Sequence, residues 1–464
     1  MEVKPHTMAI LTTAIALSSA AAHAQQMDSM PGMSMPAGQS MNMPMQMPME
    51  KDKGGDTGME MQMGPKVTGL AKTVEAHASS GTSLEPGSTP APMLMTMRGN
   101  WMLMFHANVF VADTQQTSVR GGDKLFSTNW FMPMAQRQWG PGELTLRSMF
   151  SLEPATVTDR QYPLLFQQGE TAYGKPIADG QHPHDFVMEF AALYDWRLNE
   201  KTLLSFYAAP VGDPAIGPTA YPHRASAFED PVGTLGHHQE DSTHISDDVV
   251  TVGLTHRWVL LEASGFHGRE PNEHRWQVQQ GAIDSWSTRL TVAPTENWSG
   301  QFSYGRLHSP EQLFPTEDQK RMTASIMWNK AFSKTSNLAS TVAWGHTHDV
   351  GPGHPENSYL LESTLRFRDR NYAFTRMEDV DRTSELLLGE NPLPAGFVEE
   401  PAGRVQAYTF GYDRDLGNLP HMRTALGAQV TAYTVGSRLE PIYGSDPMGV
   451  VVFLRLRPFG KADN

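Results

Sequence analysis

Residues 100–112, with the sequence NWMLMFHANVFVA, carry the pattern that decides the fold. One alternating set of side chains is apolar and consists of Trp101, Leu103, Phe105, Ala107, Val109 and Val111. The set between them is mixed and includes Met102, Met104, His106 and Asn108. Successive side chains of a β-strand point to opposite faces, so a period of two predicts a strand that separates two different environments.

Alternation of this kind recurs through the rest of the chain, in short stretches separated by Pro, Gly, Asn and Asp. Bacterial outer-membrane barrels have an even number of strands, so the pattern predicts a transmembrane antiparallel β-barrel of about 14–16 strands over residues 96–464. The candidate strands cover residues 99–112, 127–138, 142–153, 186–198, 201–208, 249–258, 259–268, 286–294, 298–307, 320–332, 336–347, 358–368, 371–380, 404–414, 421–435 and 448–457.

The segments between these candidate strands differ in length, which orients the predicted barrel. Tight turns at Asn199-Glu200 and Asp369-Arg370-Asn371 suit the periplasmic side. Aromatic residues near strand ends are candidates for the girdles at the membrane surfaces, and they include Trp130, Trp139, Trp196, Trp258 and Trp298. The long insertions suit the outer side or a plug, and they cover residues 155–185, 209–248, 268–285, 308–319 and 381–403.

The first 24 residues have the features of an export signal. A polar start with Lys4 precedes an apolar stretch over residues 8–22, and Ala22-His23-Ala24 offers a cleavage site. This stretch is shorter than the about 20 apolar residues that a transmembrane helix needs, and no later run reaches that length. We therefore expect export to the outer membrane of a Gram-negative bacterium, where lipid surrounds the barrel.

The overall composition narrows the classes of function. The formal net charge of −14 argues against a nucleic-acid partner, which needs a basic surface. The absence of cysteine excludes a disulfide scaffold, a cysteine nucleophile and any thiolate metal site. A soluble β-sandwich or propeller is the alternative fold, although no repeat of fixed period supports a propeller.

Residues 25–95 form a low-complexity segment between the signal and the predicted barrel. Twelve methionines fall between Met27 and Met63, mixed with Pro, Gly, Ser and Gln. Such a segment buries too little apolar surface to offset the entropy lost on ordering, so we expect it to be disordered and to lie in the periplasm.

The methionine spacing in this leader suits a soft metal ion. Thioether sulfur is a soft, neutral ligand for Cu(I) and Ag(I), and an M-x-M spacing lets two sulfurs of an extended chain converge on one ion. A flexible tether is the alternative, although Gly, Ser and Pro would serve that role alone. The candidate ligands are Met33, Met35, Met41, Met43, Met45, Met47, Met49, Met59, Met61 and Met63.

Histidines cluster with acidic residues at three places in or beside predicted loops. Imidazole and carboxylate together suit Cu(II), Zn or Ni, but loop histidines are also common as ordinary polar residues. Whether the three clusters meet in space does not follow from the sequence. The candidate ligands are His182 and His184, then His237, His238 and His244, and finally His346 and His348.

The order of an export signal, a methionine-rich leader and a β-rich domain resembles the copper resistance protein B family of outer-membrane proteins. The resemblance rests on this architecture and on the M-x-M leader between Met27 and Met63. It implies copper handling in the periplasm and outer membrane, where periplasmic metal-handling proteins would be partners.

Three functions are consistent with these features. The leading hypothesis is copper or silver binding, tolerance or export, with the leader as the main site. The second is a porin-like channel for small solutes, with the leader as a tether. The third is an outer-membrane hydrolase using Ser242 and His244, but the sequence lacks a G-x-S-x-G, H-E-x-x-H or P-loop motif, so we expect no catalysis.

Overall fold

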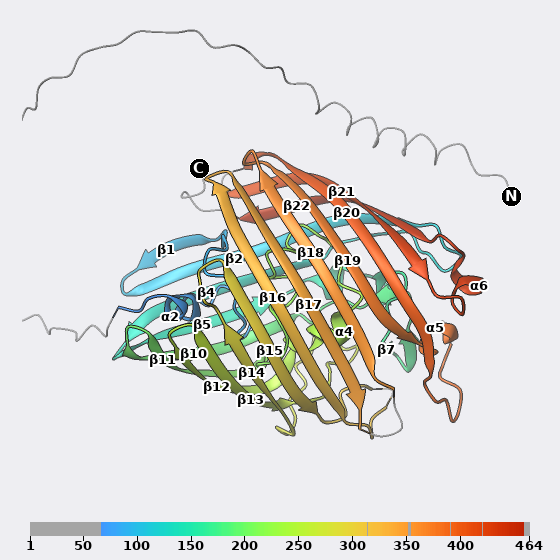
Figure 1. The fold of residues 1–464 in the computed structure, drawn as a ribbon, viewed down its shortest axis with the longest axis horizontal. Helices are drawn as coiled ribbons and strands as arrows, with labels where there is room; N and C mark the ends of the chain where they lie inside the picture. The colour runs from blue at the N-terminus through green and yellow to red at the C-terminus, as the bar shows by residue number, and fades with distance from the viewer. Residues whose placement is uncertain (1–65, 313, 351–353, 390, 420, 459–464) are drawn as a thin grey trace, which may run out of the picture. The chain divides into compact units, whose positions relative to one another are not determined.

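Sixteen antiparallel strands follow one another around a closed ring, and the last strand pairs with the first (Figure 1). This ring confirms the predicted class of fold, and each of the sixteen predicted stretches corresponds to one of its strands. The strands are β2 (Trp101–Gln116), β4 (Asn129–Trp139), β5 (Gly142–Phe150), β10 (Val187–Asn199), β11 (Thr202–Gly212), β12 (Ser246–His256), β13 (Val259–His267), β14 (Ser285–Val292), β15 (Trp298–Leu307), β16 (Gln319–Ser333), β17 (Ser336–Asp349), β18 (Glu356–Phe367), β19 (Asn371–Thr383), β20 (Pro401–Leu419), β21 (Met422–Val435) and β22 (Met448–Pro458).

The computed structural model describes residues 66–458, except 313, 351–353, 390 and 420 (Figure 1). These residues belong to the compact unit Glu60–Asn464. The predicted export signal and residues 25–65 of the predicted leader lie outside the described residues. Within the described part, no helix is long and apolar enough to cross a membrane.

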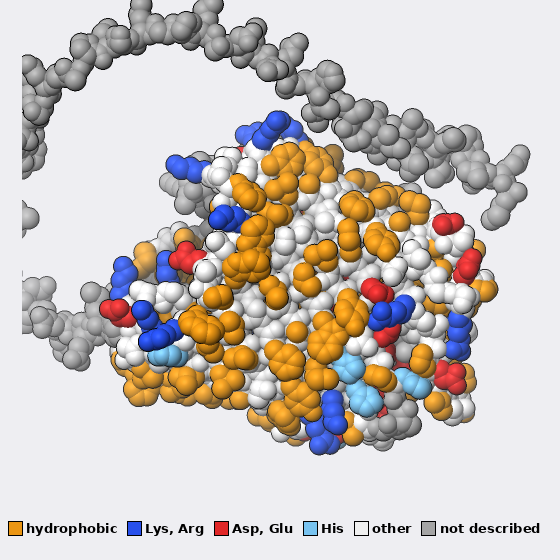
Figure 2. Space-filling view, viewed as in Figure 1, with side chains coloured by type: hydrophobic (Ala, Val, Ile, Leu, Met, Phe, Trp, Pro, Cys, Tyr) orange, Lys and Arg blue, Asp and Glu red, His pale blue; other side chains and the backbone are white. Residues whose placement is uncertain are grey.

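The alternation in the sequence becomes an alternation across the barrel wall. In β12, Thr251 and Thr255 face the lumen and are buried, whereas Val250, Val252 and Leu254 point outward and are exposed. Hydrophobic side chains spread over the outer face of the strands in Figure 2. A closed barrel with an apolar outer face satisfies its backbone groups in lipid. The protein is an outer-membrane β-barrel.

The tryptophans predicted to form a girdle divide into two groups. Trp139, Trp196, Trp258 and Trp298 are exposed, and all lie near the end of the barrel that carries the short turns. Trp130 is only 5% exposed, so its assignment to a girdle was wrong. The reason is the phase of β4, in which Trp130 shares the lumen-facing side with two buried methionines.

The short and long connections lie at opposite ends of the barrel, as the sequence predicts. The turns after Asn199 and after Phe367 lie at the end where β2 begins and β22 ends. The long connections, including residues 151–186 and 213–245, lie at the other end. By the usual orientation of outer-membrane barrels, the short-turn end faces the periplasm.

A short additional strand completes the wall where the ring closes. β22 pairs only with the second half of β2, from Val109 to Gln116. Strand β1 (Leu94–Arg98) pairs with the first half, from Trp101 to Phe105, on the edge of β2 opposite to β4. β1 therefore covers backbone groups that β22 leaves unpaired, which matters because an unpaired strand edge is costly in lipid.

Residues 66–92, which we call the plug segment, fold inside the short-turn end of the barrel. The sequence predicts disorder over residues 25–95, and for this part the structure differs. Helix α2 (Leu70–Ala76) packs Leu70 and Val74 against Leu203 and Leu260 of the wall. The segment has few apolar residues of its own, and the wall supplies the surface that orders them.

Residues 213–245, which we call the inner loop, connect β11 to β12 and fold into the lumen. Almost all of its side chains are buried.

The shorter elements outside the ring are β3 (Lys124–Phe126), α3 (Glu153–Thr156), β6 (Tyr162–Pro163), β7 (Glu170–Ala172), β8 (Lys175–Ile177), β9 (Gly180–Gln181), α4 (His237–Glu240), η1 (Ser242–His244), α5 (Glu385–Leu388) and α6 (Glu440–Tyr443). Three segments that are distant in sequence therefore reach into the lumen: the plug segment, the inner loop and the long connection before β10, whose Phe166 and His184 are buried.

The plug segment makes a close approach to the inner loop at Gly81. Its φ of +53° and a clash of any Cβ with the backbone oxygen of Asp213, 2.5 Å away, both favour glycine. We expect Gly81→Ala to make the free energy of plug docking less favourable by about 1–3 kcal/mol, because the added Cβ overpacks the contact. The cost of the positive φ adds to this value. Hydrogen–deuterium exchange of residues 77–92 measures this change.

Gly69→Ala is the matched control for this prediction. Gly69 has a similar φ of +60°, but a Cβ there meets nothing within 4 Å. Both positions have a positive φ that disfavours alanine, but only at Gly81 does a Cβ also clash. Equal exchange in the two variants would show that the approach at Gly81 does not hold the plug.

Candidate functional site

Buried arginines line the lumen and fix its contents to the wall. A buried charge is tolerated only when it is paired or hydrogen-bonded, and removing one partner of such a pair typically costs about 3–5 kcal/mol. Eight arginines of the wall and the inner loop are at most 7% exposed: Arg147, Arg224, Arg289, Arg321, Arg376, Arg382, Arg455 and Arg457.

Arg147 of β5 holds the plug segment. Its guanidinium donates to the backbone oxygens of His77 (3.0 Å), Ser79 (2.6 Å) and Gly81 (2.5 Å). It also pairs with Glu189 of β10 at 2.8 Å. One arginine on β5 therefore links three backbone oxygens of the plug to the wall strands β5 and β10.

Arg224 and Glu229 hold the inner loop. Arg224 pairs with Glu362 of β18 at 2.5 Å and with Asp241 of the same loop at 3.1 Å. Glu229 pairs with Arg455 and Arg457 of β22, each at 2.9 Å. These contacts attach the loop to β18 and β22, which are four positions apart in the ring.

Two of the three predicted histidine clusters meet in the lumen. The ring of His244 lies 5.4 Å from that of His184 and 5.1 Å from that of His237, and His238 is 5.5 Å from His237, measured between ring centroids. All four side chains are buried. The inner loop carries three of them, and the long connection before β10 carries His184.

Carboxyl groups fix the orientation of this histidine group. Nδ1 of His237 lies 2.6 Å from Asp241 Oδ1, and Nδ1 of His184 lies 2.9 Å from Glu153 Oε2. Burial opposes ionisation of Asp241, but His237 and Arg224 prevail and lower its pKa below the ordinary value. Burial, and then the charges of His237 and His184, lower the pKa of His244 to about 3, so its ring is neutral.

A second pair of histidines lies closer to the plug segment. The rings of His106, on β2, and His223, in the inner loop, are 6.4 Å apart, and both contact Trp130. Nε2 of His223 lies 2.9 Å from Sδ of Met149. Burial, followed by the charges of His106 and Arg147, lowers the pKa of His223 well below its ordinary value.

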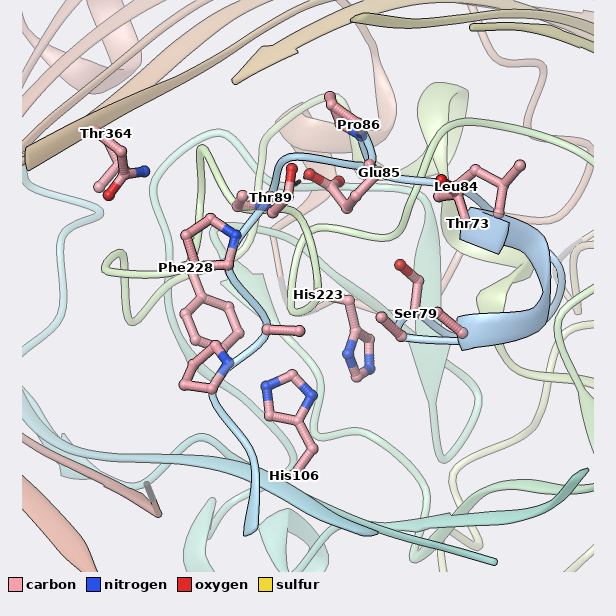
Figure 3. A pocket seen from close by; sticks show the side chains of 18 of the residues that line it. Thr73, Ser79, Leu84, Glu85, Pro86, Thr89, His106, His223, Phe228 and Thr364 are labelled. Carbon is pink, nitrogen blue, oxygen red and sulfur yellow. Dashed lines mark hydrogen bonds between the residues drawn. The ribbon is translucent and has the colours of Figure 1, made fainter. Parts of the chain in front are cut away.

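A cavity of about 430 Å³ leads from the short-turn end to these two rings. Its outer part is lined by Asn337 and Pro458, which lie near strand ends there, and by the plug segment. Figure 3 shows His106 and His223 side by side at the inner part of the cavity, below Ser79 and Glu85 of the plug. We call this cavity the vestibule.

The remaining predicted histidines do not join the lumenal groups. His346 and His348 share the outward face of β17 with Trp344, and the His346 ring stacks on Trp344. His182 Nδ1 lies 2.9 Å from the backbone oxygen of the next residue, Pro183. The third predicted cluster therefore lies on the outside of the barrel, away from the other two.

The leader methionines Met33, Met35, Met41, Met43, Met45, Met47, Met49, Met59, Met61 and Met63 lie outside the described residues. In the part of the chain that the structure covers, no three His, Cys, Asp or Glu side chains are grouped so that they could hold a metal ion. A site that uses methionine sulfur falls outside this set of ligand types. The sequence analysis did not single out His106, His223 and Met149, which could form such a site. The signal was present in the lumen-facing set of residues 100–112, which contains Met104 and His106.

The residues considered for hydrolysis have other partners. Ser242 Oγ donates to Glu270 at 3.0 Å and accepts from Arg321 at 2.7 Å. His244 Nδ1 lies 2.8 Å from the backbone oxygen of Asp241. Ser242 is thus part of an ion-pair network and is not hydrogen-bonded to His244.

Solved outer-membrane porins align with this barrel at low sequence identity. An anion-selective porin from Comamonas acidovorans aligns with a TM-score of 0.48 and 10% identity, over 77% of this chain and 99% of the porin. For OmpF of Salmonella typhi in complex with daunomycin, the TM-score is 0.46 and the identity 8%, over 78% and 100%. The likeness is one of fold. No protein-family model and no curated protein matches the sequence.

The contact between the plug segment and the inner loop is expected to weaken as pH rises. Asp213 accepts a hydrogen bond from Ser80 at 2.9 Å, and burial raises its pKa to about 7. An acid with a raised pKa keeps its proton in the folded state, so its contribution is full below pH about 4 and is lost as pH rises to about 7. Asp213→Asn should reduce this loss.

The measurement is the free energy of unfolding in urea at several pH values, for the wild type and Asp213→Asn in the same detergent. Burial also raises the pKa of Glu85 to about 7, so part of the slope should remain in the variant. An identical slope between pH 4 and 7 in both proteins would contradict the role assigned to Asp213.

Proposed function

We propose that this protein is a channel of the outer membrane for small solutes, closed by the plug segment and the inner loop. The observation that carries the proposal is the chemistry of the lumen. A sixteen-stranded ring is wide enough for an aqueous channel, and here the plug segment, the inner loop and part of the connection before β10 occupy that space. Apolar side chains such as Ile216 and Val232 pack on the wall, but the segments are also held by hydrogen bonds and ion pairs, which water can replace when a segment moves.

The vestibule supports the same proposal. It extends from the periplasmic end to His106 and His223, and His106 is the sixth of the 16 residues of β2. Beyond these rings the inner loop closes the path through its contacts with β17, β18 and β22. A solute passing through the barrel therefore requires the inner loop to leave these strands.

A pair of engineered cysteines tests this requirement, because the chain contains no cysteine. Ser226 of the inner loop and Thr341 of β17 have hydroxyl oxygens 2.6 Å apart, so Ser226→Cys with Thr341→Cys places two thiols at bonding distance. We expect the oxidised protein to lose ion conductance in planar lipid bilayers and a reductant to restore it.

The control is Thr409→Cys with Thr431→Cys. These hydroxyl oxygens are 2.8 Å apart on the neighbouring wall strands β20 and β21, so a bond there leaves the inner loop free. Conductance in this variant should not depend on oxidation. A wild type without conductance, or an oxidised Ser226–Thr341 pair that conducts as before, would refute the channel.

A second candidate function is copper or silver handling, for which the leader is the main support. Thioether sulfurs also line part of the lumen, beside His223. Removing residues 27–63 should abolish binding of several Cu(I) equivalents in competition with a Cu(I) chelator, because these residues carry twelve methionines. Full binding by the shortened chain would dismiss the leader as a metal site.

A further inference from the structure

One sector of the lumen differs in chemistry from the rest. Inward-facing positions of most strands carry Thr, Ser, Gln, Arg or Glu, as in β12 and β16. On the neighbouring strands β2, β4, β5 and β10, methionines lie among such polar residues. Five methionines form one buried cluster, with at most 6% exposure: Met104, Met132, Met134, Met149 and Met188.

The histidine pair lies at the edge of this methionine cluster. Nε2 of His223 and Sδ of Met149 face each other at 2.9 Å. Trp130, itself a member of the cluster, contacts both His106 and His223, with ring centroids 4.8 and 4.2 Å apart. Two imidazoles and a thioether therefore converge from three separate segments of the chain.

The histidine nitrogens are buried without hydrogen-bond partners. His106 is 4% exposed, and neither Nδ1 nor Nε2 has a partner, while Nδ1 of His223 also has none. A buried polar group without a partner lowers stability, because it has lost its bonds to water and gained none in the protein. Packing alone does not explain this cost, because phenylalanine or leucine would fill the same space without it. A bound ion would satisfy the nitrogens.

We propose that His106, His223 and Met149 form a binding site for a soft monovalent cation, Cu(I) or Ag(I), at the inner end of the vestibule. The proposal rests on the channel function, which it deepens by naming a class of solute. Nδ1 or Nε2 of each histidine and Sδ of Met149 would be the ligands, and Met132 and Met188 lie in the same cluster behind them.

The ligand set favours a monovalent over a divalent ion. Thioether is a ligand for Cu(I) and Ag(I), whereas carboxylate-rich sites suit harder ions. All three proposed ligands are neutral, and the charged neighbours Arg147 and Arg457 are already paired with Glu189 and Glu229. None of the three ligands is a carboxylate, and burial raises the pKa of Glu85, the plug carboxyl in the same cavity, to about 7, so a second positive charge is poorly compensated.

Access to the site is through the vestibule. His106 and His223 both line this cavity, and the plug segment covers it (Figure 3). The residues are therefore reached from the periplasmic end, where the methionine-rich leader is expected. Deeper in the lumen, His184 and His244 are close enough to His223 to affect its pKa.

The test is X-ray absorption at the copper edge on the full chain loaded with Cu(I) under anaerobic conditions. Residues 25–65 contain methionine but no histidine, so nitrogen ligands report on the barrel rather than on the leader. We expect nitrogen and sulfur scattering in the wild type. In Met149→Leu and His223→Phe we expect the loss of one Cu(I) equivalent and of the nitrogen signal.

Met327→Leu is the matched control, because Met327 is also buried, at 3% exposure, but lies on β16 outside the cluster. Its Cu(I) content should equal that of the wild type. Leucine conserves the volume of methionine, so Met149→Leu should retain the fold. Heat-dependent mobility in gel electrophoresis checks that each variant is a folded barrel.

Three results would overturn the site. The first is wild-type copper bound by sulfur alone, and the second is a nitrogen signal that survives both Met149→Leu and His223→Phe. The third is an equal loss of bound Cu(I) in Met149→Leu and Met327→Leu. Conductance measured on the same preparations separates this outcome from failure of the channel. A protein that conducts but shows no nitrogen-bound copper rejects the site only, and one that binds copper but never conducts rejects the channel only.

Discussion

The rest of the structure depends on the absence of water from the bilayer interior, which requires every backbone N–H and C=O there to be paired within the protein. The ring of strands meets this requirement by closing β22 onto β2, and β1 meets it where β22 ends too early. Once the wall is closed, the lumen is separated from lipid. Arginine and glutamate pairs such as Arg147 and Glu189 can therefore lie at the level of the membrane.

Two kinds of chemistry share this enclosed space. Over most of the wall, acids and bases hold the plug segment and the inner loop by directional contacts, of which Arg224 with Glu362 is an example. In the sector of β2, β4, β5 and β10, thioethers and neutral imidazoles lie beside such a pair, Arg147 with Glu189, and nitrogens of His106 have no partner. Ion pairs account for the position of the two segments, but they do not account for this sector. A solute that prefers soft, neutral ligands would connect the sector to the function of the barrel.

The wall could be predicted from the sequence because the alternation of side chains between the two faces of a strand is visible in a short stretch of residues. Residues 100–112 already separate the outward face from the inward face, and the same rule places His346 and His348 outside with Trp344. The order of residues 66–92 could not be predicted, since it comes from wall residues such as Arg147 and Leu203 that are distant in sequence. For the same reason, the approach of His184 to His244, and of His223 to Met149, depends on the path of the inner loop.

The plug segment comes before β2 in the chain, and the ring closes only when β22, the last described strand, pairs with β2. A segment that ends up enclosed can therefore enter while the sheet is still open. α2 meets its wall partners on β11 and β13 before the final strands are in place, if pairing follows the order of synthesis. The plug segment can then serve as a template on which the sheet bends. Closure of the barrel is in that case coupled to the docking of the plug segment.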